Sequence, residues 1–121
     1  MNVIAEKREL LTGLIGYLGN FESGVRQTVT MFQEGSIDAA KKNTIEVIDG
    51  LGWIVEGVEV LHDILQIDVF DLKNTLEEVE VSLQNDDDVM TSDLFENELL
   101  PVLATWKQRM IDVDGQPNSG G

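Results

Sequence analysis

The single histidine of the chain stands three residues after a glutamate, in Glu59-Val60-Leu61-His62. On a helix this Glu-x-x-His spacing brings a carboxylate and an imidazole to one face, as in the di-iron carboxylate bundles. Those metal sites need a second copy of the motif and two further glutamates, and no second histidine exists here. The alternative is a histidine at the edge of the apolar face, hydrogen-bonded to a carboxylate or water. The ligand count favours this alternative, so we predict no metal ligand and no cofactor.

A second group of possible ligands is the acidic stretch Asn85-Asp86-Asp87-Asp88, followed by Ser92 and Asp93. These side chains carry the oxygen atoms that Ca²⁺ prefers. The spacing departs from the EF-hand pattern, because Thr91 stands where that loop has its glycine and Asn97 where it has its bidentate glutamate. The mismatch favours a solvated acidic turn, with a cation-binding loop as the alternative.

Nucleophilic or acid–base catalysis has little support. The chain has no Cys, and its one histidine has no recognisable Ser or Asp partners in the sequence. Carboxylates are too numerous for one pair to stand out. We therefore predict a protein that is not an enzyme, with no catalytic residue.

Composition excludes several functional classes. The 121 residues include 23 acidic and 8 basic side chains, a formal charge of −15. Nucleic-acid binding depends largely on Lys and Arg displacing counterions, so we expect no nucleic-acid partner. No secretion signal and no apolar run of about 20 residues is present, so we expect a cytoplasmic protein without a membrane interaction. An acidic surface can instead attract a basic partner.

Hydrophobic periodicity predicts four helices. The first spans Val3 to Gln33, with an apolar stripe made of Leu10, Leu11, Leu14, Leu18, Phe21, Val25, Val29 and Phe32. Gly35 suits a left-handed helix end and Ser36 an N-cap, and a second helix runs from Ile37 to about Gln66. The third begins after Asp68, and the fourth is capped by Ser92 or Asp93. Pro101 falls on its outer side, where we expect a bend.

These elements predict an all-α fold: an antiparallel four-helix bundle with a long N-terminal helical hairpin and two shorter helices. Residues 1–113 form the single domain. Residues 114–121 are polar and rich in glycine, which predicts a disordered tail.

The long hairpin carries the predicted interaction surfaces. On the first helix, small and mixed residues form a line suited to close approach, and we predict a homodimer interface there, made of Gly13, Tyr17, Asn20, Gly24 and Met31. The alternative is that the glycines mark a kink or local fraying of this helix. On the second helix, like charges recur at three- and four-residue spacing beside a narrow apolar line, and a basic partner would offset their repulsion. The predicted partner-binding residues are Asp49, Trp53, Glu56, Glu59, Val60 and Asp63.

Two segments carry a resemblance to a family. Gly50-Leu51-Gly52-Trp53-Ile54, together with the stretch from Asp93 to Trp106 (DLFENELLPVLATW), resembles small uncharacterised helical proteins of Gram-positive bacteria. In type, the chain is also similar to flagellar export chaperones, short acidic helical bundles that hold an apolar helix of their client. This similarity implies a chaperone-like role.

The functional hypothesis is a non-enzymatic cytoplasmic protein-interaction module. It would present an apolar groove with an acidic rim to a partner that carries a basic or amphipathic helix. The competing hypothesis is a cation- or metal-binding helical bundle that uses Glu59, His62 and the acidic loop.

Overall fold

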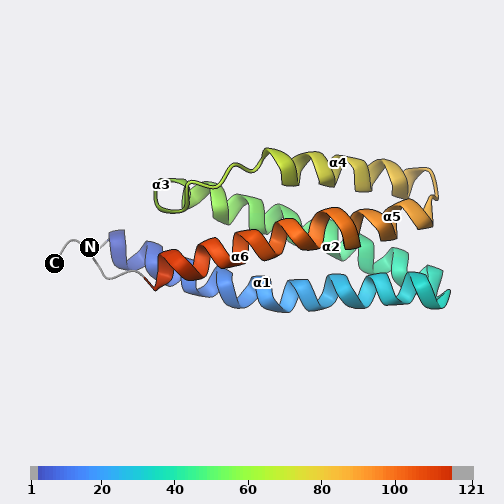
Figure 1. The fold of residues 1–121 in the computed structure, drawn as a ribbon, viewed down its shortest axis with the longest axis horizontal. Helices are drawn as coiled ribbons and strands as arrows, with labels where there is room; N and C mark the ends of the chain where they lie inside the picture. The colour runs from blue at the N-terminus through green and yellow to red at the C-terminus, as the bar shows by residue number, and fades with distance from the viewer. Residues whose placement is uncertain (1–2, 116–121) are drawn as a thin grey trace.

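The computed structural model describes residues 3–115, and of Val3 and Ile4 only the helical backbone. Its elements are α1 (Val3–Glu34), α2 (Ile37–Val60), α3 (His62–Leu65), α4 (Phe70–Gln84), α5 (Asp88–Leu94), the π-helical η1 (Phe95–Leu99) and α6 (Leu100–Asp114) (Figure 1). The described residues contain no strand. The all-α bundle prediction is confirmed. The part of the predicted tail from residue 116 onward lies outside the described residues.

Four antiparallel arms make the bundle, formed in order by α1, by α2, by α4 and by α5 with η1 and α6 (Figure 1). The first arm packs against the second and the fourth, and α4 packs between α2 and α5. The start of α1 and the end of α6 therefore lie at the same end. In the part of the chain that is described, no helix is both long and apolar enough to cross a membrane.

The turn between α1 and α2 matches the prediction. Gly35 has φ +85°, and the Ser36 amide donates to the Met31 carbonyl at 2.9 Å, which is the six-to-one bond of a Schellman ending. Ser36 occupies the N-cap position of α2, although its hydroxyl makes no capping bond.

The periodicity predicted a second helix that continues to about Gln66, and this prediction is wrong. The second arm breaks at Leu61, where the backbone leaves helical geometry, and α3 follows as a single short turn. Arg109 Nε donates to the carbonyl of Leu65 at 2.9 Å, so a side chain of α6 satisfies the end of this turn. The N-cap of α4 is Val69, one residue after the predicted Asp68, whose Oδ1 accepts from the Phe70 amide at 2.9 Å at the start of this helix.

The fourth arm begins earlier than Ser92 or Asp93, and that prediction is wrong. Asp87 is the N-cap, and its Oδ1 accepts from the Met90 amide at 3.1 Å. Ser92 is buried within α5, and the neighbouring Thr91 hydroxyl lies 2.7 Å from that of Ser82, buried between α4 and α5. These small polar residues join two helices rather than start one.

Pro101 is exposed, as predicted, and the helix continues through it. Just before it, the Leu100 amide donates to the Phe95 carbonyl, a π-type bond between residues five apart. The wider turn lies where proline, lacking an N–H, would interrupt the regular helical bonding.

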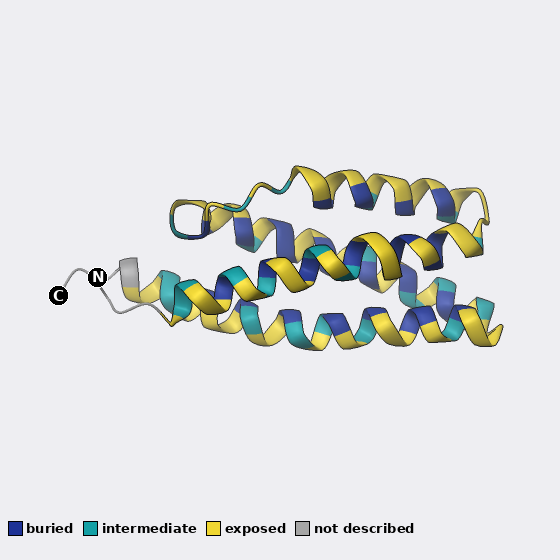
Figure 2. Cartoon of the chain, in the orientation of Figure 1, coloured by how far each residue is buried: buried dark blue, intermediate teal, exposed yellow. Residues whose placement is uncertain are grey.

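All four arms carry buried residues at intervals along their length, between exposed ones (Figure 2). The predicted apolar stripe of α1 is buried or half-buried except at Leu10, which is 42% exposed. Leu10 instead borders the surface hollow described next.

Candidate binding groove

The outer surface between α1 and α2 contains an apolar hollow of about 690 Å³, which we call the hairpin groove. Both helices of the long hairpin supply its walls. The residues that line it are Glu9, Leu10, Gly13, Leu14 and Tyr17 of α1, and Trp53, Glu56, Gly57 and Val60 of α2. Thus the groove combines two residues of the predicted dimer line, Gly13 and Tyr17, with three of the predicted partner-binding set, Trp53, Glu56 and Val60.

Large apolar side chains stand uncovered around this groove. Trp53 is 69% exposed, Val60 55%, Tyr17 44% and Leu10 42%. Single exposed apolar residues are ordinary on protein surfaces, whereas these four border one hollow and form an apolar patch around it.

Two glycines shape the floor of the groove. A Cβ atom at Gly57 would lie 3.3 Å from Leu14 Cδ2, so the absence of a side chain lets Leu14 pack directly against α2. A Cβ atom at Gly13 would meet nothing within 4 Å, which leaves the α1 wall open to solvent.

A third glycine bounds the groove. The rings of Tyr17 and Phe21 stack with centroids 6.0 Å apart, and Phe21 lies so close to Gly50 that a Cβ there would be 2.5 Å from its ring. Beyond Phe21 the same interface opens again into a second hollow of about 450 Å³. That hollow is lined by Phe21, Gly24, Gln27, Thr28, Met31, Asn43, Glu46 and Val47.

The charged residues that line the two hollows are all acidic. Glu9 and Glu56 stand on opposite walls of the hairpin groove, and Glu46 lines the second hollow. No Lys, Arg or His is among the described residues that line either.

The four acidic residues predicted as one ridge separate in the structure. Glu56 lines the groove, and Asp49 is exposed. Glu59 turns toward α4, where Lys73 Nζ lies 3.2 Å from its Oε1. Asp63 accepts a hydrogen bond from Lys7, and that bond, together with the lysine charge, lowers the pKa of Asp63. Lysines from other helices thus neutralise two of the four carboxylates.

The predicted dimer line of α1 follows the α1–α2 interface along its length. Gly13 and Tyr17 line the hairpin groove, whereas Gly24 and Met31 line the second hollow. Asn20 is exposed and lines neither.

At both candidate cation sites, a lysine pairs with one or more of the predicted carboxylate ligands. His62 is exposed at the start of α3, while Glu59 faces Lys73. In the acidic loop, Lys41 Nζ lies 2.8 Å from Asp86 Oδ1 and 3.8 Å from Asp88 Oδ1. The hydrogen bond from Lys41 lowers the pKa of Asp86 and raises that of Lys41.

Within residues 3–115, no group of three or more His, Cys, Asp or Glu side chains is arranged to hold a metal ion.

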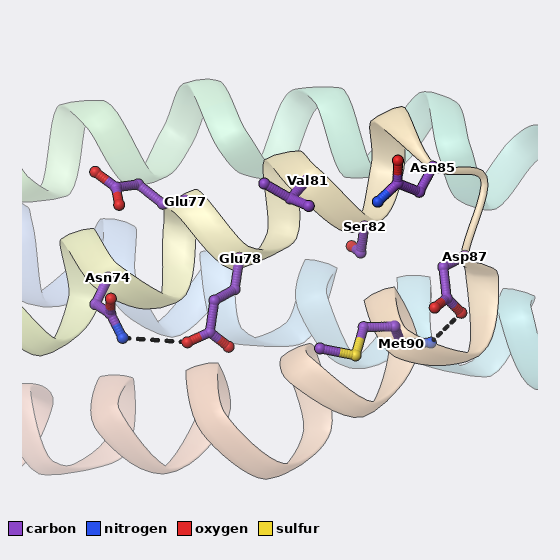
Figure 3. Close-up of a pocket in the computed structure, with 8 residues that line it drawn as sticks. All are labelled: Asn74, Glu77, Glu78, Val81, Ser82, Asn85, Asp87 and Met90. Atoms are coloured by element: carbon purple, nitrogen blue, oxygen red, sulfur yellow. Dashed lines mark hydrogen bonds between the residues drawn. The ribbon is translucent and has the colours of Figure 1, made fainter.

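A further hollow, of about 360 Å³, lies between α4 and α5 (Figure 3). We call it the polar hollow. Its walls carry Glu77, Glu78 and Asp87 beside Asn74 and Asn85. Figure 3 shows that several polar groups bond within it: Asn74 donates to Glu78 at 3.1 Å, and Asp87 accepts from the Met90 amide. Of its polar or charged side chains, Asn74, Glu78 and Asp87 are thus hydrogen-bonded within the hollow.

Sequence reasoning missed one buried charge. Glu22 is 2% exposed, and Lys107 Nζ of α6 lies 2.7 Å from its Oε1, without the angular geometry of a hydrogen bond. Arg26 approaches the other oxygen at 3.7 Å. A signal was present, because Glu22 falls within the apolar stripe of α1, four residues after Leu18 and three before Val25.

Comparison with known proteins gives a family. No curated protein and no solved structure matches the chain. A family model described as a domain of unknown function, DUF8042, matches residues 9–109. The match covers both hollows of the α1–α2 interface, and both segments on which the resemblance to an uncharacterised family rested. With most of its length matched, the chain belongs to the DUF8042 family.

Proposed function

We propose that this protein is a non-enzymatic, cytoplasmic protein-interaction module whose hairpin groove binds an apolar segment of another protein. The observation that supports it best is Trp53, which is 69% exposed at the edge of a hollow bordered by Leu10, Tyr17 and Val60. Covering such a patch with a partner removes apolar surface from water, which is favourable by about 25 cal/mol per Å² of surface buried. A chaperone-like use would be the shielding of an aggregation-prone helix of a client.

The chemistry of the walls supports binding rather than catalysis. The groove offers two glutamates and one tyrosine as its ionisable groups, and the histidine of the chain lies outside it. Aromatic and aliphatic side chains with a few charges at the margin are typical of a surface that contacts another chain.

A photo-crosslinking residue at position 53 tests the proposal in cells of the source organism. We expect a crosslink to one defined segment of a partner, found by mass spectrometry. Phe70 provides the matched control, because it is an aromatic residue of similar exposure, 68%, on α4 and outside the groove. Equal products from positions 53 and 70 would show collisional contact and contradict the proposal.

A pair of glycine substitutions then separates the groove from the fold. Gly13→Gln places a side chain in the groove, where a Cβ meets nothing within 4 Å. Gly16→Gln is the control on the same helix, since its Cβ is equally free and it lines no described hollow. Both changes should raise helix stability by up to about 1 kcal/mol. Only Gly13→Gln should abolish the crosslink.

A further inference from the structure

We infer that the occupant of the hairpin groove is an amphipathic helix with lysine or arginine along its margins. This inference rests on the proposed function, and it names the chemical class of the partner. The evidence is the shape of the α1–α2 interface, the sign of the charges along it, and the position of Trp53.

The shape favours a helix. The hairpin groove and the second hollow follow one another between two antiparallel helices, from Leu10 to Met31 along α1. At 1.5 Å per residue this corresponds to about 30 Å, or a helix of about 20 residues. A peptide that binds as an added β-strand needs a sheet edge, and residues 3–115 contain no strand.

The charges favour a basic partner. Glu9 of α1 and Glu56 of α2 line the hairpin groove, Glu46 lines the second hollow, and no Lys, Arg or His lines either among the described residues. A helix with an apolar face in the groove would carry its flanking residues to these carboxylates. Lys or Arg there would form charge-assisted bonds, whereas Glu or Asp would be repelled.

The same charges disfavour a second copy of this chain. In a two-fold dimer through this face, Glu9, Glu46 and Glu56 of one protomer would approach the same residues of the other. Each chain also carries a formal charge of −15. The predicted homodimer thus requires like charges to meet at its rim, and a basic helix does not.

Trp53 adds a further contact for a cation. Its ring is exposed on the wall that also carries Glu56, three residues further along α2. An arginine of the partner could stack on the indole face and pair with the carboxylate at once.

The test uses synthetic helices, since the natural partner is unidentified. The probe is a 20-residue peptide of Leu, Ala and Lys, with blocked ends, a fluorescent label, and Leu at three- and four-residue spacing. Two controls accompany it: a shuffled peptide with Leu spread around the helix, and a counterpart with Glu in place of every Lys. Binding is measured by anisotropy at 0.15 M salt.

Two double variants separate groove charge from total charge. Glu9→Gln with Glu56→Gln removes two charges from the groove, and Glu77→Gln with Glu78→Gln removes two from the polar hollow. We expect the first pair to raise the Kd of the basic peptide about tenfold, and the second less than twofold. Equal effects, or no effect of the first pair, would overturn the inference.

The remaining outcomes distinguish this inference from the proposed function. If the acidic peptide binds as tightly as the basic one and Gly13→Gln abolishes both, the groove binds apolar helices without charge preference. The inference would then fail and the function would stand. If no peptide binds and sedimentation shows a dimer that Gly13→Gln dissociates, a second copy is the occupant and the inference is wrong. A monomer that binds no peptide contradicts both.

Discussion

Helix α1 is held against its two neighbours in different ways. Toward the fourth arm, polar contacts cross the interface at intervals: Arg8 donates to the Asp114 carbonyl at 2.7 Å, Lys107 meets Glu22, and Gln33 donates to Glu96 at 3.3 Å. Toward α2, the contacts along the groove are apolar side chains packed on Gly50 and Gly57, and a hydrogen bond crosses beside the second hollow, from Asn43 Nδ2 to Met31 Sδ at 3.3 Å. The ion pair of Lys7 with Asp63 of α3 lies outside the hairpin groove.

The difference bears on which side of α1 can accept another chain. Hydrogen bonds and the Lys107–Glu22 ion pair already link α1 to the fourth arm, so a ligand there would have to break them without equal replacement. The α1–α2 interface leaves Leu10, Tyr17, Trp53 and Val60 in water, and covering them breaks no described hydrogen bond. An open apolar interface beside a closed polar one is the arrangement expected if α1 binds a partner on one side only.

The largest expected effect comes from removing the cation that meets Glu22. Lys107→Met leaves Glu22, 2% exposed, with only the more distant Arg26, and breaking a buried pair on one side is strongly destabilising. We expect the free energy of unfolding to fall by about 3 kcal/mol, measured by urea denaturation.

The control for this change is the exposed pair of Lys73 and Glu59, whose side chains are both more than half exposed. Lys73→Met should cost less than about 0.5 kcal/mol. Adding Glu22→Met to Lys107→Met should recover most of the loss, since replacing both charges with apolar groups is often neutral. If Lys107→Met alone changes the free energy of unfolding only slightly, Glu22 is not held in a buried ion pair by α6.

The next effect tests the floor of the α1–α2 interface. Gly50→Ala and Gly52→Ala make the same change on one helix, but a Cβ at Gly50 would lie 2.5 Å from the Phe21 ring, whereas at Gly52 it meets nothing within 4 Å. Gly52→Ala should stabilise the protein by up to about 1 kcal/mol. Gly50→Ala should be less stable than Gly52→Ala by about 1 to 2 kcal/mol, because overpacking offsets the helix propensity.

Thermal melts of the two alanine variants measure this difference. Equal stabilisation by both would show that Phe21 swings aside at little cost. Moving Phe21 out of the boundary between the hairpin groove and the second hollow would then cost little free energy, and one partner helix could occupy both hollows.

Sequence periodicity was sufficient for the fold, because each helix encodes its own buried stripe locally. Leu51, Ile54, Val58 and Leu61 recur at three- and four-residue spacing, and all are fully buried. The end of α1 was predicted because Gly35 acts locally. The start of the fourth arm was placed too late, although Asp87 also caps it locally, and the predicted cap Ser92 is buried within α5.

An apolar groove with an acidic rim was predicted, but its residues were divided between a dimer line on the first helix of the hairpin and a partner-binding line on the second. The register that brings Gly13 opposite Gly57 depends on how Leu14 packs against α2, and no single helix contains that information. The same holds for charge. The acidic ridge of α2 was predicted to repel itself, yet Lys7 and Lys73 come from other helices to pair with two of its members. Spacing along one helix gives the face of a residue but not its partner.

The smallest effect concerns the ion pair that ends the open side of α1. The hydrogen bond from Lys7 lowers the pKa of Asp63, so the folded state favours the carboxylate more than the unfolded state does. The contribution to stability is present above the unfolded pKa of about 3.9 and is lost as pH falls through the lower folded value. An NMR titration should show the Asp63 pKa return toward its usual value in Lys7→Met.

Because neither Lys7 nor Asp63 lines the hairpin groove, Lys7→Met should leave the affinity for the basic peptide unchanged. A loss of affinity with this variant would show that the binding surface continues along α1 past Glu9 toward α3. The peptide would then contact more of the α1 surface than the residues that line the hairpin groove.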